Sequence, residues 1–308
     1  MNKAMIKNKI SRTVKGNRER DGLLFSLFRY IILIGIGFVY LYPMLYMTVN
    51  SFLSVADQSD PRVTWIPREL YLENFRRAFE TLDFVKSFGI SLLMSVIPSL
   101  LQTAVCALVA FGLARFNMRS KSIWLILIIS TFILPTQVML VPRYVMFYNL
   151  NIINTVWVQY LPAAFGQGIK SAIFILVFYQ YFSTYPKSFD EAASLDGAGK
   201  FRIFIRIALP IASAAVILSL LFSFVWYWNE TYQANLLFGG RLTTLPLKLQ
   251  SFTTAYQTSY GDGTAASNPN MSVVLAGTLL SVLPMIVLYL AAQKQFITSI
   301  EQSGITGE

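Results

Sequence analysis

SFGISLLMSVIPSLLQTAVCALVAFGLA, residues 87–114, contains no charged side chain over 28 consecutive positions. An α-helix rises about 1.5 Å per residue, so roughly 20 mainly apolar residues cross the hydrocarbon layer of a bilayer. The strands of a membrane barrel alternate between polar and apolar residues over about ten positions, and this stretch does not. We therefore predict a helix that spans a membrane.

Five other apolar segments reach or approach the length of a membrane span. Hydrophobic residues make up 55% of the chain and charged residues only 13%, with a mean hydropathy of +0.54. An average soluble domain has about 25% charged residues. We predict an all-α integral membrane protein with six transmembrane helices, at 24–49, 87–114, 122–141, 161–183, 207–230 and 272–292.

Basic residues are concentrated in every second connection between these segments. Lys and Arg total 15 over 69 residues in 1–23, 115–121, 184–206 and 293–308, against 8 over 96 residues in the other connections. Short cytoplasmic connections are enriched in Lys and Arg, so both termini are predicted to be cytoplasmic. The net charge of +10 is thus attributed to orientation and contact with anionic lipid, with no nucleic acid partner. The predicted domains are a basic cytoplasmic segment (1–23), a six-span domain (24–292) and a cytoplasmic tail (293–308).

The start of the chain also has some features of a signal peptide, because a basic region precedes an apolar one. However, the apolar run from Leu23 to Val49 is much longer than the core of about 7–15 residues in a signal peptide. The following residues, Asn50-Ser51-Phe52-Leu53, contain no small-x-small cleavage pattern. We therefore predict a retained first span.

The composition excludes most chemistry by the chain itself. It contains no His and a single Cys, Cys106, which leaves no metal-ligand set and no Ser/His/Asp or Cys/His catalytic system. Gly-x-x-x-x-Gly-Lys-Ser/Thr, the phosphate-binding loop of ATPases, is not present, and the nearest strings at 197–201 and 166–171 do not match it. We predict no catalytic residues and no metal site, and any ATP-driven process requires a separate ATPase.

Proline and amide side chains interrupt several predicted spans. In membranes such residues mark contacts between helices or the lining of a cavity, and the sequence leaves both interpretations open. Lys170 is the cation deepest within an apolar segment, where it can extend to the interface or face a wet cavity. The candidate pathway-lining residues are Gln102, Gln137, Gln167 and Asn229, with prolines at Pro43, Pro98, Pro135 and Pro284.

The connection at 184–206 is predicted to form two short helices. Ser188 is a candidate N-cap, Asp190 and Glu191 lie in the first turn, and Gly197 can end the helix in a left-handed conformation. The second helix carries an apolar stripe that includes Phe201, flanked by basic residues. Such a helix could lie on lipid or dock in a protein groove, and the acidic first helix favours docking.

This loop resembles the cytoplasmic loop of ABC-importer permeases, whose pattern is Glu-Ala-Ala, three residues, Gly, nine residues, Ile, one residue, Leu-Pro. Every position and spacing is present here. The resemblance implies coupling helices that insert into a partner ATPase, which binds ATP and Mg²⁺, while this chain needs no cofactor. The candidate ATPase-coupling residues are Glu191, Ala192, Ala193, Asp196, Gly197, Phe201, Ile207, Leu209 and Pro210.

The resemblance is closest to the second permease of carbohydrate importers of the maltose-transporter type. It rests on Trp226-Tyr227-Trp228-Asn229-Glu230, on the loop 242–247, on the order of the spans, and on a tail that such permeases insert between ATPase subunits. It implies alternating access in a prokaryotic cytoplasmic membrane, with a second permease, an ATPase dimer, an extracytoplasmic solute-binding protein and a small-molecule solute, expected to be a sugar. A non-sugar solute remains an alternative. An ATP-independent secondary transporter is disfavoured because the spans contain no acidic residue away from their ends.

Overall fold

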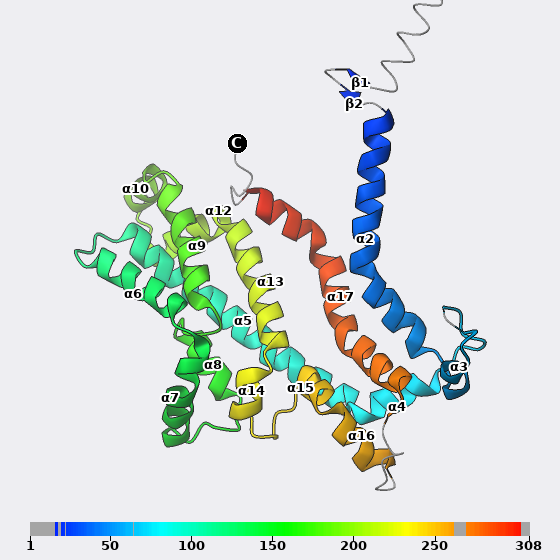
Figure 1. The fold of residues 1–308 in the computed structure, drawn as a ribbon. Helices are drawn as coiled ribbons and strands as arrows, with labels where there is room; N and C mark the ends of the chain where they lie inside the picture. The colour runs from blue at the N-terminus through cyan, green and yellow to red at the C-terminus, as the bar shows by residue number, and fades with distance from the viewer. Residues whose placement is uncertain (1–15, 18–19, 22, 64, 262–268, 303–308) are drawn as a thin grey trace, which may run out of the picture. The chain divides into compact units, whose positions relative to one another are not determined.

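The computed structural model is helical throughout, apart from a two-residue antiparallel pair formed by β1 (Gly16–Asn17) and β2 (Arg20–Asp21) (Figure 1). It describes all residues except 1–15, 18–19, 22, 64, 262–268 and 303–308. The predicted basic segment and the end of the predicted tail therefore lie largely outside the described residues. By internal contacts the chain divides into two compact units, Met1–Arg77 with Pro269–Leu279, and Ala78–Asn268 with Leu280–Glu308.

The first unit contains the first predicted span. It comprises α2 (Leu23–Ser51), α3 (Val55–Ser59), the start of α4 (Glu73–Thr81) and the start of α17 (Met271–Gln302). Asn74 is buried, and its Nδ2 donates to the carbonyl oxygens of Ser51 at 3.0 Å and Leu53 at 2.8 Å. These bonds satisfy the carbonyl of the last residue of α2 and that of a residue just beyond it, which have no partner within the helix.

The second unit is built around α5 (Phe84–Arg115), which packs against α8 (Trp157–Ala164), α9 (Ser171–Thr184) and α13 (Ser213–Asn229). Small residues such as Ala107 and Ala110 are completely buried on α5 and let neighbouring helices approach closely. The largest core joins α5 to Phe174, Phe178 and Phe182 of α9. The remaining helices of this unit are α6 (Lys121–Ile133), α7 (Thr136–Asn149), α10 (Ser188–Leu195), α11 (Lys200–Ile203), the π-helix η1 (Phe204–Ala208), α12 (Leu209–Ile211), α14 (Tyr232–Leu237), α15 (Leu245–Gln250) and α16 (Phe252–Tyr260).

Three of the described helices are long and apolar enough to cross a membrane: Leu23–Ser51, Phe84–Arg115 and Met271–Gln295. Two further spans arise if each bent helix pair is counted as one, because α6 and α7 meet at 100° and Lys200–Ile211 meets α13 at 81°. The protein is therefore an all-helical membrane protein with three to five candidate spans. The predicted count of six and the predicted orientation stay predictions.

Three predicted spans are interrupted in the structure instead of continuous, and one of them is 207–230, which is divided among η1, α12 and α13. The segment predicted at 122–141 ends as α6 at Ile133 and resumes as α7 at Thr136, because Leu134 precedes Pro135 and adopts the extended conformation that a following proline favours. The segment predicted at 161–183 is divided into α8 and α9, with Gly166 at φ +68° between them. Non-helical backbone at membrane depth is tolerated where protein buries it or where it lines a cavity.

Candidate functional site: the 184–206 loop and the helix breaks

The 184–206 loop forms the two short helices that the sequence predicts. Asp190 and Glu191 lie in the first turn of α10, and Gly197 has a φ of +80°, the left-handed conformation that ends a helix. Ser188 differs from its prediction: α10 begins at Ser188 itself, and no side chain caps it. The Ser188 hydroxyl therefore contributes no N-cap bond to the loop.

The candidate coupling residues lie mostly on the exposed side of this loop. Leu195 is 89% exposed and Phe201 is 66% exposed, so two large apolar side chains project into open space. On the opposite side the loop is anchored, since Ile203 is buried and Ala193 and Ala198 pack against the core of α5 and α9. Glu191, Ala192, Asp196, Gly197 and Pro210 are also exposed, whereas Ile207 and Leu209 are half-buried.

A π-helical turn connects the loop to α13. The backbone N–H of Leu209 donates to the carbonyl of Phe204, five residues earlier. Pro210 follows directly, and a proline lacks an N–H and clashes with the carbonyl four residues before it, which an α-helix cannot accommodate. The Leu-Pro pair of the motif thus has a local structural effect: it replaces a regular turn by a wider one at the base of α13.

Arg115, the last residue of α5, is buried beneath the loop. Its Nη2 donates to the carbonyl of Tyr185 at 2.7 Å, its Nε lies 3.4 Å from Oδ2 of Asp190, and its Cζ lies 3.5 Å from the centre of the Tyr185 ring. The Tyr185 hydroxyl donates to Oδ1 of Asp190 at 2.7 Å. Burial, and then this hydrogen bond to a carboxylate, raise the pKa of Tyr185 above its ordinary value, so the hydroxyl stays a donor at physiological pH.

Gln102 and Tyr227 hold the break between α8 and α9. Gln102 is completely buried, and its Nε2 donates to the carbonyl of Ile169 at 2.8 Å and lies 3.3 Å from Oγ of Ser223. Tyr227 donates its hydroxyl to Oε1 of Gln102 at 2.6 Å and accepts from the N–H of Ile169 at 3.3 Å. Gly168 is essential here, because a Cβ at this position would overlap both Oε1 of Gln102 and the Tyr227 hydroxyl.

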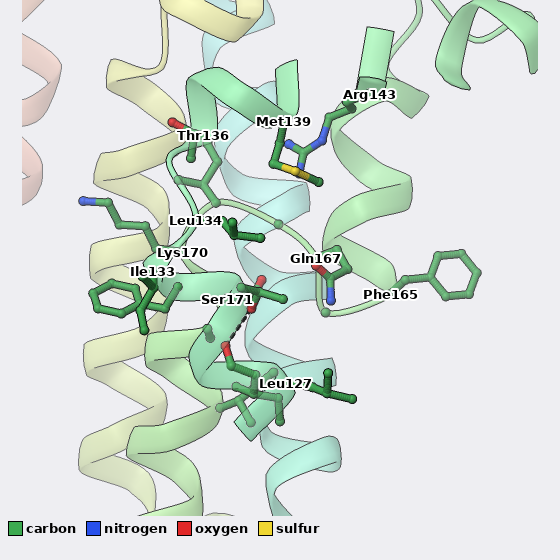
Figure 2. Close-up of a pocket in the computed structure, with 18 of the residues that line it drawn as sticks. Leu127, Ile133, Leu134, Thr136, Met139, Arg143, Phe165, Gln167, Lys170 and Ser171 are labelled. Atoms are coloured by element: carbon green, nitrogen blue, oxygen red, sulfur yellow. Dashed lines mark hydrogen bonds between the residues drawn. The ribbon is translucent and has the colours of Figure 1, made fainter. Parts of the chain in front are cut away.

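The two helix breaks line an open cavity of about 540 Å³ (Figure 2). Figure 2 shows Leu134 and Thr136 from one break and Gln167 and Ser171 from the other lining it. Ser171 is buried, and its hydroxyl has no hydrogen-bond partner among the described residues. A second cavity of about 420 Å³ adjoins the first and shares Met139, Arg143, Phe165 and Gln167 with it.

The four candidate pathway residues occupy different positions. Gln167 lines both cavities, whereas Gln102 donates to the Ile169 carbonyl in the break and lines neither cavity. Gln137 is exposed outside both linings, and Asn229 donates to the carbonyl of Val225 on its own helix. Of the four, only Gln167 therefore lines these cavities.

Lys170 is exposed and is among the residues that line the larger cavity. It directly precedes α9 in a left-handed conformation, and its Nζ lies 4.4 Å from the centre of the Trp226 ring. Figure 2 shows the side chain extended on the side opposite Phe165. The cation is stabilised by the aromatic face of α13. Among the residues that the structure describes, no three Cys, Asp or Glu side chains are grouped so that they could hold a metal ion.

Sequence reasoning identified the loop but missed the residues that anchor it and the break. The sequence predicts Arg115 only as a basic residue of a connection, Tyr185 as an aromatic residue at the end of a span and Tyr227 as part of a family motif, and it predicts no structural contact for these residues or for Gly168. The pattern Gly166-Gln167-Gly168 within a predicted span was the one available signal, since two glycines interrupt a helix.

Comparisons with known proteins agree with this geometry. Residues 88–297 match the family described as "Binding-protein-dependent transport system inner membrane component". The probable ABC transporter permease protein YurM of Bacillus subtilis is 30% identical, over 91% of this chain and 87% of that protein, and the maltodextrin transport system permease protein MdxG of the same organism is 28% identical over 94% and 100%.

A solved structure of a bacterial ABC transporter involved in the import of the acidic polysaccharide alginate has a chain with the same fold. Its TM-score is 0.72 at 20% sequence identity, and the match covers 88% of this chain and 96% of that one. The family match extends over more than half of the chain and includes both the 184–206 loop and the helix breaks. The chain therefore belongs to the family of inner membrane components of binding-protein-dependent transport systems, and it is a multi-pass permease of an ABC importer, not an enzyme.

Proposed function

We propose that the chain is one of two permeases that enclose the translocation pathway of an oligosaccharide importer. Relatives are described as permeases for arabinooligosaccharides, for maltodextrin and for melibiose, raffinose and stachyose. In this proposal a separate ATPase dimer binds ATP and Mg²⁺ and moves the spans through the 184–206 loop. An external solute-binding protein delivers the solute, and the two permeases alternate between inward-facing and outward-facing states.

The exposed apolar surface of the 184–206 loop carries the coupling part of this proposal. Leu195 and Phe201 are exposed on either side of Gly197 in the chain, and Glu191, which is also exposed, lies one turn before Leu195 on α10. Both Leu195 and Phe201 are large apolar side chains that this chain leaves uncovered, as expected where a partner protein covers an apolar surface. Glu191 supplies a charge that an Arg of the ATPase can pair with, and the neighbouring Ala192 allows close approach.

The cavity between the helix breaks supports the solute part. Its volume of about 540 Å³ falls within the range of about 300–1,000 Å³ usual for small-molecule sites. A sugar ring presents apolar C–H faces and hydroxyl groups at its edge, and the lining offers both kinds of contact. Leu127, Phe132 and Ile133 are apolar, while Gln167, Ser171 and Arg143 supply polar groups. The unpartnered Ser171 hydroxyl is a hydrogen-bonding group available to a hydroxylated solute.

The experiment is expression of the chain together with its neighbouring genes, followed by purification in mild detergent and measurement of solute uptake in vesicles. We expect a second permease and an ATPase to co-purify, and labelled oligosaccharides to be taken up only with ATP. Glu191→Lys should insert normally but abolish uptake, because it reverses the charge presented to the ATPase. Glu69→Lys, the same change at an exposed position outside the loop, is the matched control.

Two results would contradict the proposal. Unchanged uptake in Glu191→Lys would remove the coupling role of the loop. A homo-oligomer without an ATPase, active in ATP-free vesicles, would instead establish a secondary transporter.

A further inference from the structure

Helix α10 has little apolar anchorage of its own. None of its residues, Ser188 to Leu195, is buried, and only Ala193 packs against the core. An element that transmits a push from a partner must nevertheless be held firmly to what it moves. The strongest attachment of α10 is therefore polar, through Asp190.

Asp190 and Glu191 are adjacent in sequence but face different surroundings. The side chain of Asp190 is only 13% exposed and lies against Arg115, which is 5% exposed, whereas Glu191 is exposed. One acid of the first turn is thus directed inward to the end of α5, and the other outward. Only the outward one belongs to the Glu-Ala-Ala pattern.

Tyr185 joins the two charged groups. It lies directly after α9, its ring stacks under the guanidinium of Arg115, its carbonyl accepts from Arg115, and its hydroxyl donates to Asp190. The guanidinium of Arg115 is held in place by one hydrogen bond from its Nη2, by the Tyr185 ring against its face and by the Asp190 carboxylate 3.4 Å from its Nε, although this Nε makes no hydrogen bond to any residue that the structure describes. The three residues therefore connect α10 to the ends of both α5 and α9.

We propose that Arg115, Tyr185 and Asp190 form a latch that transmits movement of α10 to α5. It consists of positioning residues, which touch neither ATP nor solute. Because α5 packs against α9 and both helices contribute residues to the lining of the cavity, displacement of the end of α5 is passed to the cavity. This inference rests on the proposed coupling function of the loop.

The latch is tested first in the chain itself. Spin labels at Asn117→Cys and Ser194→Cys, both exposed positions, report the separation of α5 and α10 in a Cys106→Ser background. We expect one narrow distance distribution, and a broad one after Asp190→Asn, which removes the charge with little change of shape. Asp83→Asn, the same change at the exposed start of α5, should leave the distribution narrow.

The second measurement is the number of ATP molecules hydrolysed per solute imported by the purified complex in vesicles. Asp190→Asn and Tyr185→Phe should lower uptake per ATP by about tenfold, within the usual range of coupling between sites, while the complex stays intact. Tyr181→Phe is the matched control, since the Tyr181 hydroxyl is buried one turn earlier without a hydrogen-bond partner among the described residues. It should leave uptake per ATP unchanged.

The outcomes separate the latch from the proposed function. If distances and uptake per ATP in Asp190→Asn equal those of Asp83→Asn, the latch is overturned. If the complex falls apart in Tyr185→Phe, the residues serve assembly and the latch is likewise wrong. If the distances broaden but no ATPase ever co-purifies, the attachment of α10 stands and the coupling function fails.

Discussion

Replacement of Gly168 by alanine tests whether the break between α8 and α9 is held by the buried pair Gln102 and Tyr227. The added methyl group would overlap the Gln102 amide oxygen and the Tyr227 hydroxyl. Both side chains are buried, so neither can move aside into solvent. Both side chains would have to move, and the two hydrogen bonds that they make to Ile169 would be lost.

The magnitude follows from these two effects. Inserting a methyl group into a packed interior costs about 1–3 kcal/mol, and each lost hydrogen bond costs about 0.5–1.5 kcal/mol, for a total of roughly 2–6 kcal/mol of unfolding free energy. A loss of this size should lower the melting temperature by about 5 °C or more. Because the break borders the cavity, uptake should fall as well.

The assay heats the detergent-solubilised protein as a fluorescent fusion. Size-exclusion chromatography then measures the fraction that stays folded at each temperature. Gly89→Ala in α5 is the control, since a Cβ there meets nothing within 4 Å, and alanine in a helix is favoured over glycine. Adding Tyr227→Phe to Gly168→Ala removes one overlapping atom, so the double variant should be less destabilised than the sum of the two single variants. Equal melting temperatures for Gly168→Ala and Gly89→Ala would refute the reasoning.

Two further predictions concern Gly197 and Glu73. Gly197→Ala should reduce uptake without preventing insertion, because φ at Gly197 is +80° and a left-handed conformation costs a residue with a side chain about 1–2 kcal/mol; normal uptake would show that the turn is not required. Hydrogen bonds from Arg76 and Arg77 hold the pKa of Glu73 at about 2, below its ordinary 4.5, so its stabilising contribution is complete above pH 4.5 and is lost as the pH falls toward 2. The melting temperature of wild type should therefore exceed that of Glu73→Gln by a constant amount at neutral and mildly acidic pH, and a difference that vanishes already near neutral pH would contradict the assignment.

The sequence predicted two of the continuous helices to within a few residues, whereas α17 continues to Gln302, into the segment predicted as a tail. The helix at 84–115 and the helix at 23–51 extend the predicted ranges by only a few residues, because long apolar runs require a helix of that length. Pro135 was recognised as an interruption, but a proline inside an apolar run can either kink a helix or separate two helices. Whether the chain turns by 100° there depends on what the second helix packs against, and no local pattern records this.

The amide side chains illustrate the same limit at the level of single residues. Gln102 and Gln167 have the same chemistry and both lie in apolar segments, so both were predicted to line the pathway. In the structure one is buried against the break and the other faces the cavity. The difference arises from the direction of each side chain relative to Tyr227 and α13, which is set by tertiary packing.

Arg115 has two roles, one in the orientation of the chain and one as a structural contact, and a count of charges detects only the first. As a basic residue beside a span it contributes to the predicted orientation, which depends only on the number and location of Lys and Arg. Buried against Asp190 and Tyr185, the same guanidinium is also a structural contact, for which its planar shape matters as well as its charge. Arg115→Lys preserves the first role and impairs the second, so it should leave the orientation of the chain unchanged while broadening the separation of α5 and α10. The structural role of an arginine at such a position is therefore recognised only when the helix that it contacts is known.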